Sequence, residues 1–221
     1  MAGSGTAHLR GEEALLSVQD LVVEYPTDAG TVQAVSKISF DVLPGETLGI
    51  VGESGCGKST TGRAVLRLDR VTSGRIRFGE EWIEGASEKH MRSLRRDMQM
   101  IFQDPVSSLN PRRAVKDIVV EGMTIARASS ESREKASAAV LEQVGLPGDR
   151  FANVLPRQLS GGQAQRVAIA RALALEPRLL ICDEPVSALD VSVQAQILNL
   201  IEELKTKFAL TVVFIAHDLG V

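Results

Sequence analysis

The fold of this chain is indicated by the stretch Gly52-Glu53-Ser54-Gly55-Cys56-Gly57-Lys58-Ser59. It matches the pattern G-x-x-x-x-G-K-[ST] and lies between a short apolar run (47–51) and a segment with helical spacing (60–68). The glycines allow the backbone to wrap closely, so that successive N–H groups point at phosphate oxygens. The helix that comes next adds the positive end of its dipole. The stretch therefore predicts a phosphate-binding loop between a strand and a helix.

Side chains at the end of this loop predict how a nucleoside triphosphate and its Mg²⁺ would be held. Lys58 is expected to place its ammonium near the β- and γ-phosphates, and Ser59 to offer its hydroxyl to the metal ion. Thr60 is expected near the α-phosphate. We interpret Cys56 as a small loop residue rather than a redox sensor. The alternative for the whole stretch, a glycine-rich turn with a surface lysine, is disfavoured because strand, loop and helix all occur in order.

The composition excludes several other classes of protein. The chain has 221 residues, with 25 Lys or Arg and 28 Asp or Glu; the net charge of −3 argues against a nucleic-acid binder that works through a basic face. Only 4% of residues are aromatic, which argues against a stacking platform for single strands. The two cysteines suit neither a disulfide scaffold nor a zinc site. No apolar run approaches the roughly 18 residues that cross a bilayer. Residues 1–14 lack the apolar core of a signal peptide, so we expect a cytosolic protein.

Hydrophobic patterning predicts an α/β fold in a single domain over residues 15–221, preceded by a mobile segment over 1–14. Two stretches rich in β-branched residues predict an N-terminal antiparallel β subdomain. Apolar strands then alternate with helical segments, which predicts a mostly parallel sheet with helices on both faces. Mixed-charge helical stretches interrupted by Gly and Pro predict an inserted α-helical subdomain over about 106–160. The predicted strands are 15–25, 32–42, 47–51, 98–103, 179–183 and 211–216, with one more within 71–85, and the predicted helices are 60–68, 115–126, 132–144, 161–175 and 191–208.

Two acidic residues, Asp183 and Glu184, come directly after the apolar run 179–182. Ligands of α/β sheets bind at the carboxyl ends of the strands, so Asp183 is expected beside the phosphate-binding loop, holding Mg²⁺. Glu184 is expected to orient or deprotonate the attacking water. The alternative is that the two acids merely end the strand and cap the next segment, which is disfavoured beside an intact phosphate-binding loop.

The stretch Leu159-Ser160-Gly161-Gly162-Gln163 stands directly before a helical run and resembles the signature motif of ATP-binding-cassette (ABC) proteins. Ser160 is suited to cap the helix, and Gly161 and Gly162 would leave N–H groups accessible to a phosphate. With Gln163 these residues form a second candidate nucleotide-binding surface. The resemblance implies a P-loop NTPase core and a head-to-tail dimer, in which the signature of one subunit closes over ATP held by the phosphate-binding loop of the other.

Further motifs of the ABC family occur in the expected order. The resemblance implies that Gln103 senses Mg²⁺ and the attacking water, and that His217 reaches the γ-phosphate. Asp190 ends a stretch similar to the loop that lies across the dimer interface, and Tyr25 matches the aromatic residue that stacks on adenine. The candidate catalytic residues are thus Glu184, His217 and Gln103, and the candidate metal ligands are Ser59, Gln103 and Asp183.

Two longer stretches narrow the resemblance. Residues 102–112 (FQDPVSSLNPR) and 185–194 (PVSALDVSVQ) are similar to the ATPases of dipeptide, oligopeptide and nickel importers. The resemblance implies an ATP-hydrolysing subunit that powers uptake of peptides, or of nickel, from the cytoplasmic face of the cell membrane. Its partners would be a second ATPase subunit (a copy or a paralogue), membrane permease subunits and, indirectly, a solute-binding protein, with no nucleic acid involved. The helical subdomain would push on the permease through a groove near Gln103.

Some alternatives remain open at this point. Members of this family usually continue beyond the histidine matched by His217, so we expect a chain shortened at its C-terminal end, and it could be a nucleotide-binding fragment without turnover. A soluble ABC ATPase that clamps ribosomes or DNA, and a P-loop small-molecule kinase, are the other candidates. The acidic charge argues against DNA, and a kinase has no use for the 159–163 motif.

Overall fold

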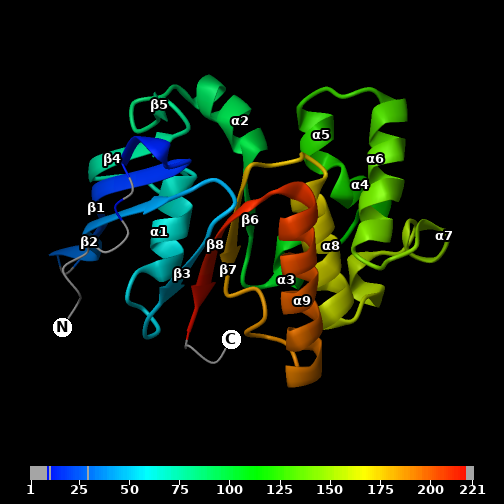
Figure 1. Ribbon diagram of the computed structural model, residues 1–221. Helices are drawn as coiled ribbons and strands as arrows, with labels where there is room; N and C mark the ends of the chain where they lie inside the picture. The colour runs from blue at the N-terminus through cyan, green and yellow to red at the C-terminus, as the bar shows by residue number, and fades with distance from the viewer. Residues whose placement is uncertain (1–8, 10, 29, 218–221) are drawn as a thin grey trace.

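The computed structural model describes residues 9, 11–28 and 30–217 (Figure 1). The segment predicted to be mobile falls mainly outside these residues, but Gly11–Glu13 form a short 3-10 helix (η1), so regular structure begins before the expected start near Leu15. The Gly11 N–H donates a hydrogen bond to Asp41 Oδ2 at 2.9 Å, which ties this helix to the neighbouring sheet.

The predicted antiparallel subdomain is confirmed. It is a sheet with the strand order β2-β1-β4-β5, in which every neighbouring pair is antiparallel. The sequence predicts the strands over 15–25 and 32–42 because β-branched residues pack well on a pleated, half-buried surface. Within 71–85 it predicts one strand, whereas the structure has two. The strands are β1 (Leu16–Thr27), β2 (Gly30–Val42), β4 (Ser73–Phe78) and β5 (Glu81–Trp82).

The predicted parallel sheet is also confirmed, and its four strands have the order β3-β8-β7-β6 with every pair parallel. Strand β7 (Leu179–Asp183) is buried along its whole length, as expected for a parallel strand covered on both faces. Its carboxyl end therefore delivers Asp183 to the edge of the sheet where ligands of α/β proteins bind. The other strands are β3 (Thr47–Val51), β6 (Met98–Ile101) and β8 (Thr211–Ala216).

The two faces of the parallel sheet belong to different hydrophobic cores. Along β7, Leu180 and Cys182 pack into a core with α8 (Gly161–Leu173) and α9 (Val191–Phe208). Leu179 and Ile181 point the other way, into a core shared with α1 (Lys58–Val65) and the antiparallel sheet. This period-two alternation places α1 and α8 on opposite faces of the sheet (Figure 1).

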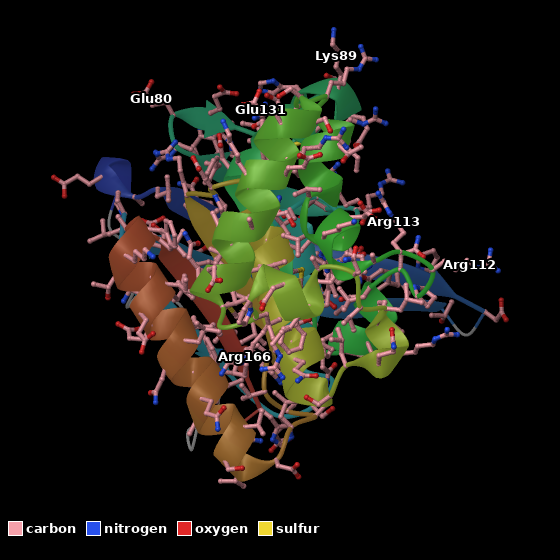
Figure 2. All side chains as sticks on the ribbon, turned by 90° about the vertical axis from the view of Figure 1, so that its right-hand side faces the viewer. Glu80, Lys89, Arg112, Arg113, Glu131 and Arg166 are labelled. Atoms are coloured by element: carbon pink, nitrogen blue, oxygen red, sulfur yellow. The ribbon has the colours of Figure 1, made fainter. Side chains whose placement is uncertain are left out.

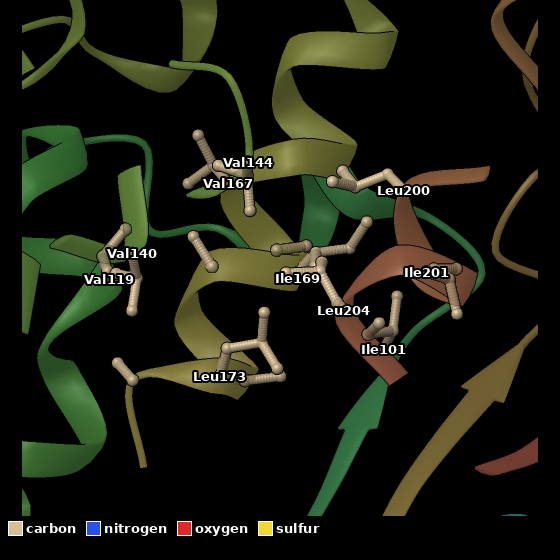
Figure 3. Close-up of a cluster of buried hydrophobic side chains, with 14 of the residues drawn as sticks. Ile101, Val119, Val140, Val144, Val167, Ile169, Leu173, Leu200, Ile201 and Leu204 are labelled. Carbon is tan, nitrogen blue, oxygen red and sulfur yellow. The ribbon is translucent and has the colours of Figure 1, made fainter. Parts of the chain in front are cut away.

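The predicted helical subdomain lies between β6 and α8. Its apolar side chains Val119, Val140 and Val144 gather against Val167 and Leu173 of α8 (Figure 3). The helix expected over 115–126 is two short helices instead, which meet at Val120. The elements are α3 (Pro105–Ser108), α4 (Val115–Val119), α5 (Glu121–Ile125), α6 (Ser130–Gln143), α7 (Gly148–Phe151) and η2 (Pro156–Gln158).

The longest helix that the sequence does not predict is α2 (Glu88–Asp97), which begins after the cap Ser87 and buries only Met91; the short helices α3 and α7 are not predicted either. The apolar face of α2 consists only of Met91 and the partly buried Leu94, and its other side chains are mostly charged, so the apolar stripe is too short to indicate a helix. Figure 2 shows charged side chains such as Lys89, Arg112 and Glu131 extending outward from the surface.

Within the part of the chain that the structure describes, no helix combines the length and the apolar character needed to cross a bilayer.

Candidate functional site

The loop between β3 and α1 has the backbone shape that its glycines predict. Gly57 stands immediately before α1 with φ +93°, in the left-handed region that favours glycine. A Cβ on Gly57 would lie 2.1 Å from the backbone oxygen of Ala34, so the antiparallel sheet also leaves no room for a side chain there. The loop therefore packs directly against β2. A helix has no partner of its own for the N–H groups of its first turn, so the start of α1 is suited to bind an anion.

Lys58 lies inside the loop rather than on the surface. Its side chain is only 5% exposed, and its Nζ donates hydrogen bonds to the backbone oxygens of Gly52 (2.7 Å) and Glu53 (2.9 Å). The same ammonium lies 3.9 Å from Glu184 Oε1. The alternative of a surface lysine on a turn is thus wrong, because the ammonium is held inside the loop by the loop's own backbone oxygens.

Ser59 and Asp183 meet across 124 residues of sequence, as the motif pairing predicts. The Ser59 hydroxyl donates a hydrogen bond to Asp183 Oδ1 at 2.7 Å. Burial raises the pKa of Asp183. The hydrogen bond from Ser59 lowers this pKa, whereas the neighbouring negative charge of Glu184 raises it further. A hydroxyl and a buried carboxylate side by side are hard oxygen donors of the kind Mg²⁺ prefers, and Mg²⁺ usually needs only one or two carboxylates beside phosphates and water. The residues present therefore fit this metal ion.

Glu184 faces Gln103, whose Nε2 donates to Glu184 Oε2 at 2.7 Å. The Glu184 side chain is 14% exposed, so the carboxylate that is bound to the Gln103 amide still has some accessible surface. Its backbone has φ +45°, which is uncommon for a residue with a side chain, and its N–H donates to the Ile215 oxygen at 3.0 Å. Strained backbone of this kind persists where the surrounding structure fixes it, and it clusters at functional sites.

Tyr25, near the end of β1, is 38% exposed. Its hydroxyl donates a hydrogen bond to Asp69 Oδ2 at 2.9 Å. Burial and Asp69 raise the pKa of Tyr25, and the nearby hydroxyl of Thr60, in the first turn of α1, lowers this pKa by a smaller amount. Tyr25 therefore lies beside the helix that begins at the phosphate-binding loop. Sequence reasoning missed Asp69 and its second partner Arg63, because their six-residue spacing across a helix end is no recognisable pattern.

The signature stretch caps α8. The N–H of Gln163 donates to Ser160 Oγ at 3.3 Å, while the Ser160 N–H donates to Gln163 Oε1 at 2.9 Å, which forms a capping box. Close packing explains the glycines: a Cβ on Gly162 would lie 2.7 Å from Val193 Cγ1, and one on Gly161 would lie 3.2 Å from Leu189 Cδ2. The signature (159–163) and the loop over 187–190, which ends at Asp190, therefore form one continuous surface.

Two further predicted site residues, His217 and Asp190, form no side-chain hydrogen bond with the described residues of this cluster. His217 nevertheless follows β8 at the same edge of the sheet, because β8 pairs with both β3 and β7 up to that end. His217 is exposed and forms no hydrogen bond or ion pair with any residue that the structure describes. Asp190 precedes α9 without a side-chain cap bond. Because α1 and α8 belong to opposite faces of the sheet, the signature of this chain does not lie over its own phosphate-binding loop.

A cavity of about 630 Å³ opens beside Gln103. It is walled by the core and by the start of the helical subdomain, and its lining includes Arg63, Gln103, Ser107, Arg171 and Asp183. The groove expected near Gln103 thus exists, and it reaches the carboxylate that faces Ser59.

Comparisons with known proteins agree with this geometry. A family model described as "ABC transporter" matches residues 35–187. The oligopeptide transport ATP-binding protein OppF of Bacillus subtilis (strain 168) is 51% identical over 211 residues, which cover 94% of this chain and 69% of OppF. A putative peptide import ATP-binding protein of Brucella ovis is 49% identical over 212 residues, which cover 95% of this chain and 66% of that protein. This chain thus spans about two thirds of the length of these relatives.

Among solved structures, the dimeric ATP-binding cassette MJ0796, in a post-hydrolysis state bound to ADP and Pi, matches with a TM-score of 0.83 at 31% identity. The match covers 93% of this chain and 89% of that chain. Family model, relatives and fold all confirm the resemblance first indicated by the 159–163 motif. The chain belongs to the ABC transporter family, as an ATPase of the ATP-binding-cassette type.

Proposed function

We propose that this chain is the ATP-hydrolysing subunit of a peptide importer, and that it works as a dimer with two Mg-ATP molecules between its subunits. The observation that carries the proposal is the convergence of Lys58, Ser59, Gln103, Asp183 and Glu184 at one edge of the parallel sheet. The names of the relatives support peptides as the cargo. The proposal places the chain on the cytoplasmic face of the membrane, bound to permease subunits that a solute-binding protein supplies.

In this proposal the residues of the chain act by positioning and electrostatics, since phosphoryl transfer leaves little covalent work to a protein. Lys58 binds the β- and γ-phosphates, and Tyr25 stacks on adenine. Ser59, Asp183 and Gln103 would hold Mg²⁺, which neutralises charge on the phosphates when bound. Glu184 accepts the proton of the attacking water, and Gln103 orients that carboxylate. His217 comes to the γ-phosphate when the dimer closes.

The dimer explains why one chain carries two anion-binding helix ends on opposite faces of its sheet. The start of α1 serves ATP bound by the chain itself, and the start of α8 serves ATP bound by the partner. The closed state binds ATP more tightly because the second surface exists only there, and this difference in affinity shifts the population toward closure. Hydrolysis removes the γ-phosphate and allows reopening, while the helical subdomain transmits the motion through the groove beside Gln103.

Mixing two inactive variants tests the shared sites. Lys58→Ala disables the loop, and Ser160→Arg blocks the signature, so each variant alone is expected to lose ATP hydrolysis. In a mixed dimer one of the two sites combines the intact loop of one subunit with the intact signature of the other. An equal mixture is therefore expected to recover about a quarter of wild-type phosphate release. Absence of recovery in a mixture whose members are folded by circular dichroism, and which dimerises, would contradict shared sites.

Peptide uptake tests the cargo. Cells that lack this chain are expected to lose ATP-dependent accumulation of a radiolabelled oligopeptide, while accumulation of radiolabelled nickel is unchanged. Re-expression of the wild-type chain should restore uptake, and re-expression of Glu184→Gln should not. Unchanged peptide uptake combined with loss of nickel uptake would reverse the assignment, and association of the chain with polysomes rather than with membranes would favour a soluble clamp.

A further inference from the structure

Asp69 lies in the turn after α1 and joins two side chains from different elements. Its Oδ2 accepts hydrogen bonds from the Tyr25 hydroxyl and from Arg63 Nε, both at 2.9 Å, and its Oδ1 accepts from Arg63 Nη2 at 3.1 Å. Two parallel bonds from a guanidinium to a carboxylate give a strong and directionally specific pair. Asp69 is therefore a fixed acceptor for the tyrosine hydroxyl.

Asp69 and Tyr25 differ in how much of their surface is exposed. The Asp69 side chain is only 14% exposed, whereas Tyr25, taken as a whole residue, is 38% exposed. The tyrosine is thus held at its hydroxyl while the residue keeps accessible surface. Burial and Asp69 raise the pKa of Tyr25, so the hydroxyl stays protonated and keeps donating, and the bond to Asp69 is the main cause that raises the pKa of Arg63.

The position of Arg63 connects this contact to the nucleotide site. Arg63 lies on α1 one turn beyond Ser59, and α1 is the helix that starts at the phosphate-binding loop. Thr60, in the first turn of the same helix, is close to Tyr25. A single rigid helix therefore sets both the phosphate end of the site and, through Arg63 and Asp69, the position of the ring.

We propose that Asp69 is a positioning residue for nucleotide binding: backed by Arg63, it holds the Tyr25 ring in the orientation that stacks on adenine. This inference rests on the proposed function, in which Tyr25 is the stacking residue. Without the bond to Asp69, the ring has free rotamers, and ordering it on the base takes part of the binding free energy. Asp69 acts through Tyr25 and touches neither the phosphates nor the attacking water.

Calorimetric titration of the whole chain with Mg-ATP and with Mg-tripolyphosphate separates this role from a structural one. Asp69→Ala is expected to weaken Mg-ATP binding on the order of fivefold, the effect of one lost hydrogen bond, and to leave tripolyphosphate binding unchanged because that ligand has no base. Tyr25→Phe should give the same loss, and the double variant should lose no more than either single one. Asp69→Asn keeps an acceptor oxygen and should restore most of the affinity.

Glu84→Ala is the matched control, because Glu84 is another partly exposed carboxylate paired with an arginine, Arg75, at 3.3 Å. It should leave both affinities unchanged. Wild-type Mg-ATP affinity in Asp69→Ala, or an equal loss of tripolyphosphate binding, would overturn the proposal. If Tyr25→Ala itself leaves Mg-ATP affinity unchanged, the stacking role in the proposed function fails as well; if Tyr25→Ala weakens binding while Tyr25→Phe and Asp69→Ala do not, only the positioning role fails.

Discussion

Glu184→Gln should lower the rate of ATP hydrolysis by about 10²–10⁴-fold, the range that a general base contributes, without weakening ATP binding. A glutamine keeps an oxygen that can accept the 2.7 Å bond from Gln103, so the local geometry survives. It has no negative charge, so the proton of the attacking water has no acceptor. In the wild type the Lys58 ammonium lies 3.9 Å from Glu184 Oε1. In the variant, the γ-phosphate no longer competes with this carboxylate for the ammonium.

The expected products of this variant are an ATP-bound dimer and little phosphate. Steady-state phosphate release measures the rate, equilibrium titration measures the affinity, and size-exclusion chromatography with Mg-ATP measures the dimer. Glu202→Gln, an exposed glutamate on α9 paired with Lys205 at 3.7 Å, is the control and should behave like the wild type. Turnover close to the wild-type rate in Glu184→Gln would show that another group takes the proton.

Much of this site could be predicted from sequence because its chemistry is encoded in short stretches. The loop 52–59 and the two acids at the end of β7 are each encoded in one short stretch, and parallel strands deliver such stretches to one edge of the sheet. The pairing of Ser59 with Asp183 results from that rule alone, although 124 residues separate them. Strands β1, β2, β3, β7 and β8 were equally clear, because β-branched or apolar runs of the right length leave few other structures.

The features that could not be predicted depend on contacts between elements. The bond from Tyr25 to Asp69 requires the end of β1 to lie beside the turn after α1, which no local pattern encodes. The packing of Gly162 against Val193 depends on how α8 and α9 cross, so the sequence suggested only an anion site there. Helix α2 escaped prediction because it buries a single methionine. The positive φ of Glu184 could not be predicted either, because glutamate rarely adopts this backbone conformation.

Asp183→Asn should stabilise the nucleotide-free protein at neutral pH while abolishing most of its ATP hydrolysis. Asp183 is 5% exposed, and burial raises its pKa, so the folded state disfavours the charge that the residue carries at neutral pH. Asparagine keeps an oxygen for the Ser59 hydroxyl and has no charge to bury. The melting temperature in EDTA is expected to rise by roughly 2–4 °C for each 1 kcal/mol of this cost that is removed.

The pH dependence of the difference identifies its cause. An aspartate in the unfolded chain has a pKa of about 3.9. Because the pKa of Asp183 is higher in the folded state, its charge lowers the free energy of unfolding as the pH rises from that value through the folded pKa. The advantage of Asp183→Asn should therefore be largest at neutral pH and should close as the pH falls toward about 3.9 and below, where both states of the wild type become protonated. Asp117→Asn, at an exposed position of α4, should show no such difference. A variant less stable than the wild type at neutral pH in EDTA would show that burial is not the dominant effect.

Adding Mg-ATP should reverse the order of the two proteins. The wild type gains about 2.7 kcal/mol of stability at a ligand concentration of 100 times Kd, whereas a variant with weakened metal binding gains less at the same concentration. Hydrolysis should fall on the order of 10²–10³-fold, since a metal ion contributes several kcal/mol of transition-state stabilisation and about 1.36 kcal/mol is a factor of ten. The same buried carboxylate would then weaken the empty fold and strengthen the loaded one, because its charge gains a positive partner only when Mg²⁺ is bound with the nucleotide.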